Sequence, residues 1–91
     1  MKAEIFFNEY ENNTGFVYTW YNNFSIKSEI CNDTIHIEAN KEGLMSLAAN
    51  LISLAQDEVP EGTHIELDDY NSLEENSKNL IFERKDHFNY T

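Results

Sequence analysis

KEGLMSLAANLISLAQD, residues 41–57, is the stretch of sequence that decides the fold. Apolar residues recur in it at steps of three and four, the spacing that places them on one face of an α-helix. Asn40 is the expected N-cap, and Glu42 suits the positive end of the helix dipole. Gly43 weakens the first turn by up to about 1 kcal/mol relative to alanine, so we expect it where the helix start approaches another backbone closely. The sequence therefore predicts an amphipathic helix over about 41–57 whose apolar stripe covers a sheet: Leu44, Leu47, Ala48, Leu51, Ile52, Leu54 and Ala55.

Six further segments alternate between apolar and polar residues, which is typical of half-buried strands. They span residues 3–7, 16–21, 25–30, 34–39, 63–68 and 79–85, and residues 86–91 are expected to form a tail. In the second segment Phe16, Tyr18 and Trp20 fall on one face. The sequence predicts a single α+β domain over residues 1–91, of order β-β-β-β-α-β-β. Its mainly antiparallel sheet of five to six strands carries the one amphipathic helix, about 41–57, on one face.

The charge balance is the strongest feature of the composition. Six Lys and Arg residues stand against 17 Asp and Glu residues, a net charge of −11 in 91 residues. Nucleic acid and anionic membrane are read by basic residues, so neither is expected as a partner. Cys31 is the only cysteine, no apolar run approaches the roughly 18 residues of a membrane span, and no signal peptide is recognised. We expect a cytoplasmic protein that is a monomer or weak dimer when free.

The carboxylates are unevenly distributed. No Lys or Arg stands between Lys41 and Lys78. An acidic face of this density projects a negative potential beyond the ~8 Å Debye length and steers a basic protein toward it. A solvated acidic face, with Tyr70 at the edge of the core, is the alternative. The predicted partner-binding residues are Asp57, Glu58, Glu61, Glu66, Asp68, Asp69, Tyr70, Glu74 and Glu75.

Two other classes of protein stay open. A metal- or ligand-binding module is possible if two strands are neighbours, because period-two alternation then gathers five ligands: His36, Glu38, His64, Glu66 and Asp68. A structural subunit that self-associates through an open sheet edge is the other. Nothing positions a catalytic group: the chain has no G-x-S-x-G elbow, phosphate-binding loop, dinucleotide fingerprint or H-E-x-x-H motif. We therefore expect no enzyme activity and no cofactor.

Several short motifs follow one another in the second half of the chain: GLMSLA (43–48), LAQD (54–57), VPEGTH (59–64), LD (67–68), NSLE (71–74) and an apolar strand within 77–85. In this order they resemble the immunity protein 32 family, over roughly residues 43–85. Glu66 stands where that family carries a second histidine, which argues against a histidine-based metal site in this strand.

The resemblance implies a small cytoplasmic immunity protein of a bacterial polymorphic toxin system, such as contact-dependent inhibition. Such a protein binds one cognate toxin domain and silences it, without catalytic residues of its own. Toxin domains that attack nucleic acid need basic surfaces. We therefore expect the partner to be a basic nuclease whose active site or substrate groove is occluded by the acidic surface.

Overall fold

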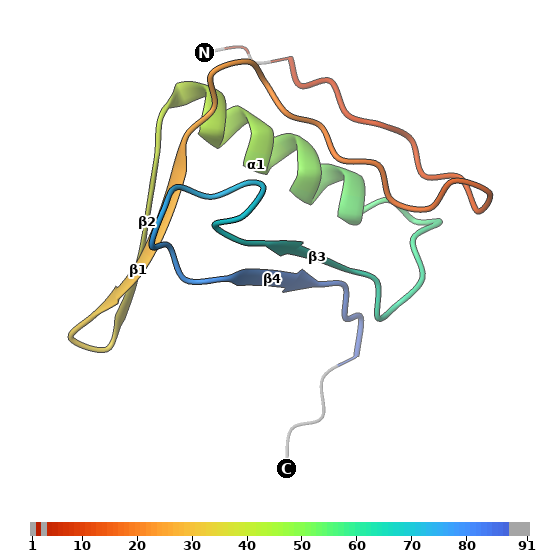
Figure 1. Cartoon of the computed structure of the whole chain (residues 1–91). Helices are drawn as coiled ribbons and strands as arrows, with labels where there is room; N and C mark the ends of the chain where they lie inside the picture. The colour runs from red at the N-terminus through yellow and green to blue at the C-terminus, as the bar shows by residue number, and fades with distance from the viewer. Residues whose placement is uncertain (1, 3, 88–91) are drawn as a thin grey trace.

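The computed structural model describes Lys2 and residues 4–87. Its elements are two hairpins on either side of a helix in the sequence: β1 (Ile26–Cys31), β2 (Thr34–Ala39), α1 (Lys41–Leu54), β3 (His64–Leu67) and β4 (Leu80–Glu83) (Figure 1). β1 pairs antiparallel with β2, and β3 pairs antiparallel with β4, as two separate sheets. Ala3, in the first expected strand, and residues 88–91, in the expected tail, lie outside the described residues.

The expected single sheet of five to six strands is wrong. The described part of the chain contains four strands in two sheets of two, in the order β-β-α-β-β. The expected strands over 3–7 and 16–21 are not strands in their described residues, although the chain from residue 4 to residue 21 runs alongside α1 (Figure 1). At Asn8, Thr19 and Tyr21 the backbone is hydrogen-bonded to side chains of the helix and not to a neighbouring strand. The alternation of apolar residues does not reveal such bonds.

Three polar side chains of α1 make these bonds. The Asn50 side chain accepts from the Thr19 N–H at 2.8 Å and donates to the Thr19 carbonyl at 3.1 Å, as a neighbouring strand would. The Ser46 hydroxyl accepts from the Tyr21 N–H, and the Ser53 hydroxyl donates to the Asn8 carbonyl. All three side chains are buried, and a buried polar group is stable only when it is hydrogen-bonded.

The buried face of the helix therefore overlaps only in part with the expected stripe, through Leu54 and the partly buried Leu47. Its buried residues are Gly43, Ser46, Ala49, Asn50, Ser53 and Leu54. In the expected apolar stripe, Leu44 is 58% exposed, and Leu51 and Ile52 are also exposed. The N-cap prediction is confirmed, because the Asn40 side chain accepts from the Gly43 N–H at 2.7 Å. The close approach at Gly43 is also confirmed, since a Cβ there would lie 2.4 Å from the Ser25 carbonyl oxygen.

The first hairpin is covered only at its base. Ile26 and Ser28 are buried, whereas Ile30 and Ile35, which face each other across the strands near the tip, are 61% and 70% exposed. The tip projects away from the rest of the molecule (Figure 1). The expectation that this whole apolar face is covered is therefore wrong.

The second hairpin contributes one side of the core. Ile65 and Leu67 of β3 are buried, and Leu80 and Phe82 of β4 pair with them across the strands. Residues 74–78 connect the two hairpins: the Glu74 N–H donates to the Ile26 carbonyl and the Lys78 N–H to the Ser28 carbonyl, while the Ser28 hydroxyl donates to the Lys78 carbonyl. Ile26 and Leu67 thereby share one cluster with partly buried Trp20, Phe24, Ala39, Leu47, Leu80 and Phe82.

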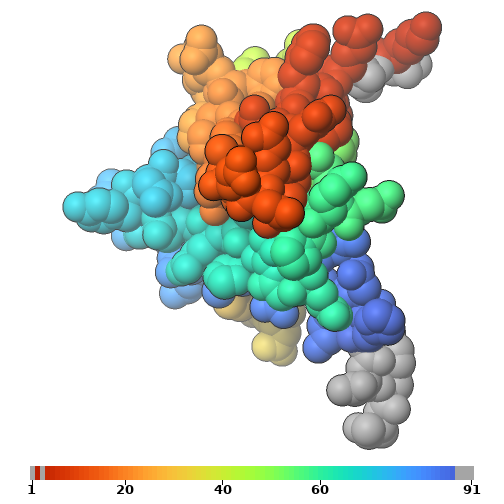
Figure 2. Space-filling model, turned by 90° about the vertical axis from the view of Figure 1, so that its right-hand side faces the viewer, coloured from red at the N-terminus to blue at the C-terminus, as the bar shows by residue number. Residues whose placement is uncertain are grey.

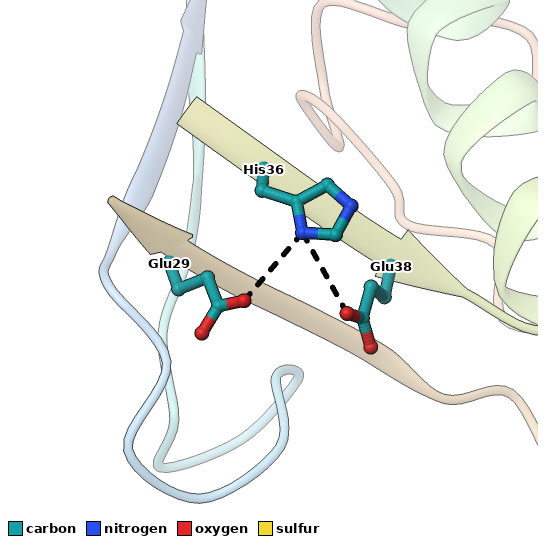
Figure 3. A group of neighbouring side chains, drawn as sticks. All are labelled: Glu29, His36 and Glu38. Atoms are coloured by element: carbon teal, nitrogen blue, oxygen red, sulfur yellow. Dashed lines mark hydrogen bonds and ion pairs between the residues drawn. The ribbon is translucent and has the colours of Figure 1, made fainter. Parts of the chain in front are cut away.

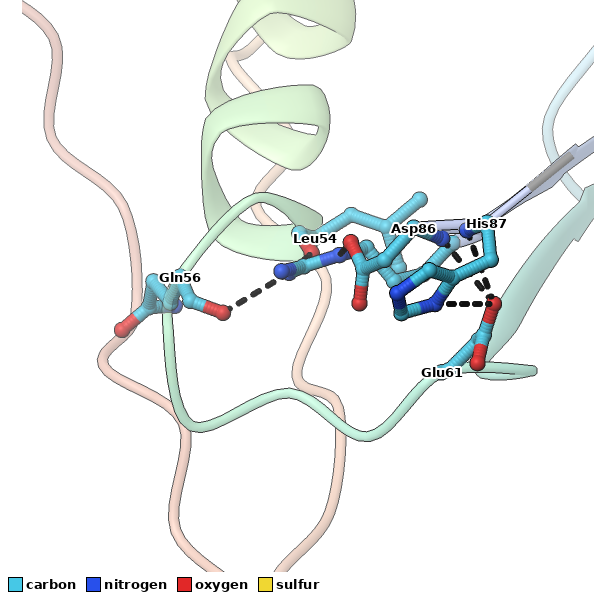
Figure 4. A network of polar contacts seen from close by, with 6 residues as sticks. Leu54, Gln56, Glu61, Asp86 and His87 are labelled. Atoms are coloured by element: carbon cyan, nitrogen blue, oxygen red, sulfur yellow. Dashed lines mark hydrogen bonds and ion pairs between the residues drawn. The ribbon is translucent and has the colours of Figure 1, made fainter.

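A residue distant in sequence caps the C-terminus of α1. The helix ends at Leu54, three residues before the expected end, and its last turn contains no basic residue. Arg84, just after β4, donates from Nη1 to the carbonyls of Leu54 and Gln56 at 3.1 and 2.9 Å (Figure 4). A cation is favourable at the negative end of the helix dipole. Among the described residues no helix has the length and apolar character needed to span a membrane.

Candidate partner-binding surface

The chain from residue 57 to residue 75 crosses one face of the molecule. Figure 2 shows it there, coloured green to cyan, next to the orange N-terminal segment. Of the nine residues predicted to bind a partner, eight are exposed and Asp68 is half-buried. Tyr70 is 95% exposed, so its ring stands in solvent and not at the edge of the core. We call these nine residues the acidic surface: Asp57, Glu58, Glu61, Glu66, Asp68, Asp69, Tyr70, Glu74 and Glu75.

Three of its carboxylates accept hydrogen bonds from other parts of the chain. Asp68 Oδ1 accepts from the N–H groups of Tyr70 and Asn71, both at 3.1 Å, which fixes the loop that follows β3. Glu74 accepts from the Ser25 hydroxyl at 2.7 Å. Glu61 accepts from the Asp86 and His87 N–H groups, and its carboxylate lies 3.9 Å from His87 Nδ1 (Figure 4). These three side chains have a structural role whatever else they contact.

The other five carboxylates have no such role. Between described residues, no hydrogen bond or ion pair engages the side chains of Asp57, Glu58, Glu66, Asp69 and Glu75. Exposed carboxylates without a cation nearby repel one another and destabilise the folded chain slightly. A basic partner would relieve that repulsion on binding.

A row of aromatic side chains borders the acidic surface. The ring centroids of Phe16 and Tyr18 lie 5.2 Å apart, those of Tyr18 and Trp20 5.8 Å, and those of Trp20 and Phe24 4.7 Å. The prediction that Phe16, Tyr18 and Trp20 share a face is thus confirmed, although the segment is not a strand. We call these four residues the aromatic row.

A hollow of about 270 Å³ lies where the aromatic row meets the acidic surface. It is lined by Tyr18, Trp20, Glu66, Leu67, Asn71 and Ser72. Tyr18, Trp20 and Asn71 were not among the predicted binding residues. The period-two aromatic pattern was visible in the sequence, but nothing there placed it beside Glu66, about fifty residues further along.

The five-ligand metal site is not assembled. His36 and Glu38 lie on β2, whereas His64 and Glu66 lie on β3, and these strands belong to separate sheets. His36 instead stands between two glutamates of its own hairpin, with Nδ1 3.5 Å from Glu29 Oε1 and 3.6 Å from Glu38 Oε1 (Figure 3). Glu29 was not among the predicted ligands, although it lies directly opposite His36 in the register. All three side chains are exposed, and their ligand atoms lie within 4.8 Å of one another.

One comparison with known proteins identifies the chain. No curated protein and no solved structure shows a significant match to it. The sequence profile described as immunity protein 32 matches residues 34–85, from the start of β2 to just beyond β4. The match covers more than half of the chain and includes α1, the second hairpin and the acidic surface. It agrees with the resemblance seen in the motifs of the second half, and the chain belongs to the immunity protein 32 family.

Proposed function

We propose that this immunity protein binds a basic nuclease toxin domain through the acidic surface and occludes its active site or substrate groove. The carrying observation is that Asp57, Glu58, Glu66, Asp69 and Glu75 are exposed and without partners among the described residues. Family membership supports a cognate toxin as the partner. The net charge of −11 supports a basic one.

The protein acts in this proposal by binding alone. The hydrogen bonds of Asp68 and Glu74 hold the surface in place before the partner arrives, so little conformational entropy is lost on association. Electrostatic steering by such a surface raises association rates toward about 10⁸–10⁹ M⁻¹s⁻¹ at low salt. The physiological setting we propose is the cytoplasm of a toxin-producing bacterium and its siblings.

A matched pair of charge reversals tests the proposal. Asp69→Lys/Glu75→Lys changes the acidic surface, and Glu29→Lys/Glu38→Lys makes the same change on the first hairpin; each pair moves the net charge from −11 to −7. The toxin domain encoded next to this chain is the partner to be measured. We expect the first pair to slow association by about tenfold or more at low salt and the second by about twofold at most, because potentials are screened beyond ~8 Å.

Circular dichroism would confirm that both double variants fold, as expected for exposed strand and loop residues. Equal effects of the two pairs would place the interface elsewhere. If a folded wild-type protein neither binds the adjacent toxin domain nor protects against it, the proposed function is wrong.

A divalent metal site on the first hairpin is the second candidate function. The observation that favours it is the placement of Glu29, His36 and Glu38 on one face, with Nδ1–oxygen separations of 3.5 and 3.6 Å. Ligand atoms about 3.4 Å apart suit tetrahedral coordination at bond lengths near 2.1 Å. Lys27, directly opposite Glu38, places a positive charge on the same face and weakens the site.

A further inference from the structure

The hollow between the aromatic row and the acidic surface has the chemistry of a receptor for a single cationic side chain. At about 270 Å³ it is smaller than the roughly 300–1,000 Å³ of a small-molecule site. One wall is aromatic, from Tyr18 and Trp20, and Glu66 is the only ionisable acid or base among its lining residues besides the tyrosine hydroxyl. Polar side chains of Asn71 and Ser72 complete it.

The charge of this hollow is uncompensated. Glu66 is exposed, and no described residue bonds to its carboxylate. Asp68 and Asp69 follow two and three residues later, so a cation approaching Glu66 enters a region that is already negative. An anionic or neutral polar occupant would gain nothing from that field.

The carboxylate of Glu66 favours arginine over lysine. The Tyr18 and Trp20 rings beside it stack on each other, 8° apart with 5.8 Å between their centroids, and Trp20 also stacks on Phe24 at 4.7 Å, so ring edges border the hollow. A guanidinium is planar and weakly hydrated and presents paired N–H donors to a carboxylate. An ammonium is more strongly hydrated and makes no such paired contact.

From these observations we infer that the hollow binds an arginine side chain presented by the cognate toxin domain, with Glu66 as its carboxylate partner and Trp20 beside it. This inference rests on the proposed function for the identity of the partner. It places one specific contact on the acidic surface. Arginine is among the residues enriched at the positions that carry most of the binding energy of protein interfaces.

The first experiment needs no toxin. Trp20 is the only tryptophan, so its fluorescence reports on the hollow directly. We expect Nα-acetyl-arginine amide to change that fluorescence saturably, with Nα-acetyl-lysine amide several-fold weaker and the norleucine amide inactive. Glu66→Gln, which keeps the shape of an exposed side chain, should weaken the arginine amide by about tenfold. Glu29→Gln, on the first hairpin and equally exposed, is the matched control and should have no effect.

The second experiment uses the toxin domain with the same two variants. A loss of about tenfold in affinity for Glu66→Gln, absent in Glu29→Gln, is the expected result. Unchanged toxin affinity in Glu66→Gln, or a fluorescence response to the arginine amide that is absent or indifferent to this substitution, overturns the inference while leaving the proposed function intact. Failure of the wild-type protein to bind the toxin overturns the proposed function instead.

Discussion

Replacing Gly43 with alanine brings two physical effects into direct opposition. Gly43 lies in the first turn of α1, where alanine is more favourable by up to about 1 kcal/mol because it restricts the unfolded chain. The added Cβ, however, would lie 2.4 Å from the Ser25 carbonyl oxygen, 3.0 Å from Ile26 Cγ1 and 3.1 Å from Ala39 Cβ. The clash and the propensity therefore act with opposite sign on the free energy of unfolding.

The clash is the larger effect because its nearest atom belongs to the backbone. The Ser25 carbonyl accepts from the Asn40 N–H at 3.1 Å, and Asn40 is the N-cap, so moving the carbonyl disturbs the start of the helix and the base of the first hairpin together. Overpacking of this kind costs typically about 1–3 kcal/mol, and a rigid neighbour places it at the upper end. After the gain in helix propensity is subtracted, we expect Gly43→Ala to destabilise the protein by about 2 kcal/mol.

Thermal unfolding followed by circular dichroism measures this. For a domain of this size 1 kcal/mol shifts Tm by roughly 4–8 °C, so the expected decrease is about 8–16 °C. Gly62→Ala is the control, because a Cβ at Gly62 meets no atom within 4 Å and adds only the strain of its φ of +95°. If Gly43→Ala left Tm unchanged or raised it, the close approach of the helix start to the hairpin would be wrong.

Three further predictions concern the rest of the molecule. Asn50→Leu should lower the free energy of unfolding in urea by about 2–3 kcal/mol and speed hydrogen exchange at the Thr19 amide, because it leaves that buried backbone without partners; slow exchange in the variant would contradict this. Zinc measured by calorimetry should bind weakly, through a site lost in His36→Ala and kept in His64→Ala, since three exposed ligands form an open site; micromolar or tighter binding would refute it. Sedimentation should show a weak, concentration-dependent dimer that Ile35→Lys abolishes, because β2 pairs with only one strand and this side chain is 70% exposed; a dimer that persists in the variant would exclude association through this hairpin.

The elements that agree with the prediction are those formed by interactions between residues close together in the sequence. β2 begins and ends at the expected residues, β1 is displaced by one residue, and β3 and β4 lie within their expected segments. The turn at Asn32 and Asp33 has positive φ at both residues, which Asn and Asp tolerate better than other side chains and which suits a tight hairpin. Each of these features depends on residues close together in the sequence.

The N-terminal third shows where that reasoning fails. Residues 16–21 alternate as a strand does, but their partner is the polar stripe of α1, whose members lie 25 to 31 residues away at Ser46 and Asn50. Serine and asparagine in a helix ordinarily face solvent, so the apolar stripe was the natural choice for the buried face. The predicted number of strands was wrong for this reason.

The sequence by itself determined the family, the helix with its Asn40 cap, the four segments that form strands and a segment of dense negative charge, because motifs, periodicity and charge are local properties of the chain. Only the tertiary structure decided which face of α1 is buried, that Arg84 caps its C-terminus, and that Trp20 lies beside Glu66. Each of these depends on contacts between residues distant in sequence. Such contacts form only when the whole chain folds, because folding decides which polar groups are buried and which atoms they bond to.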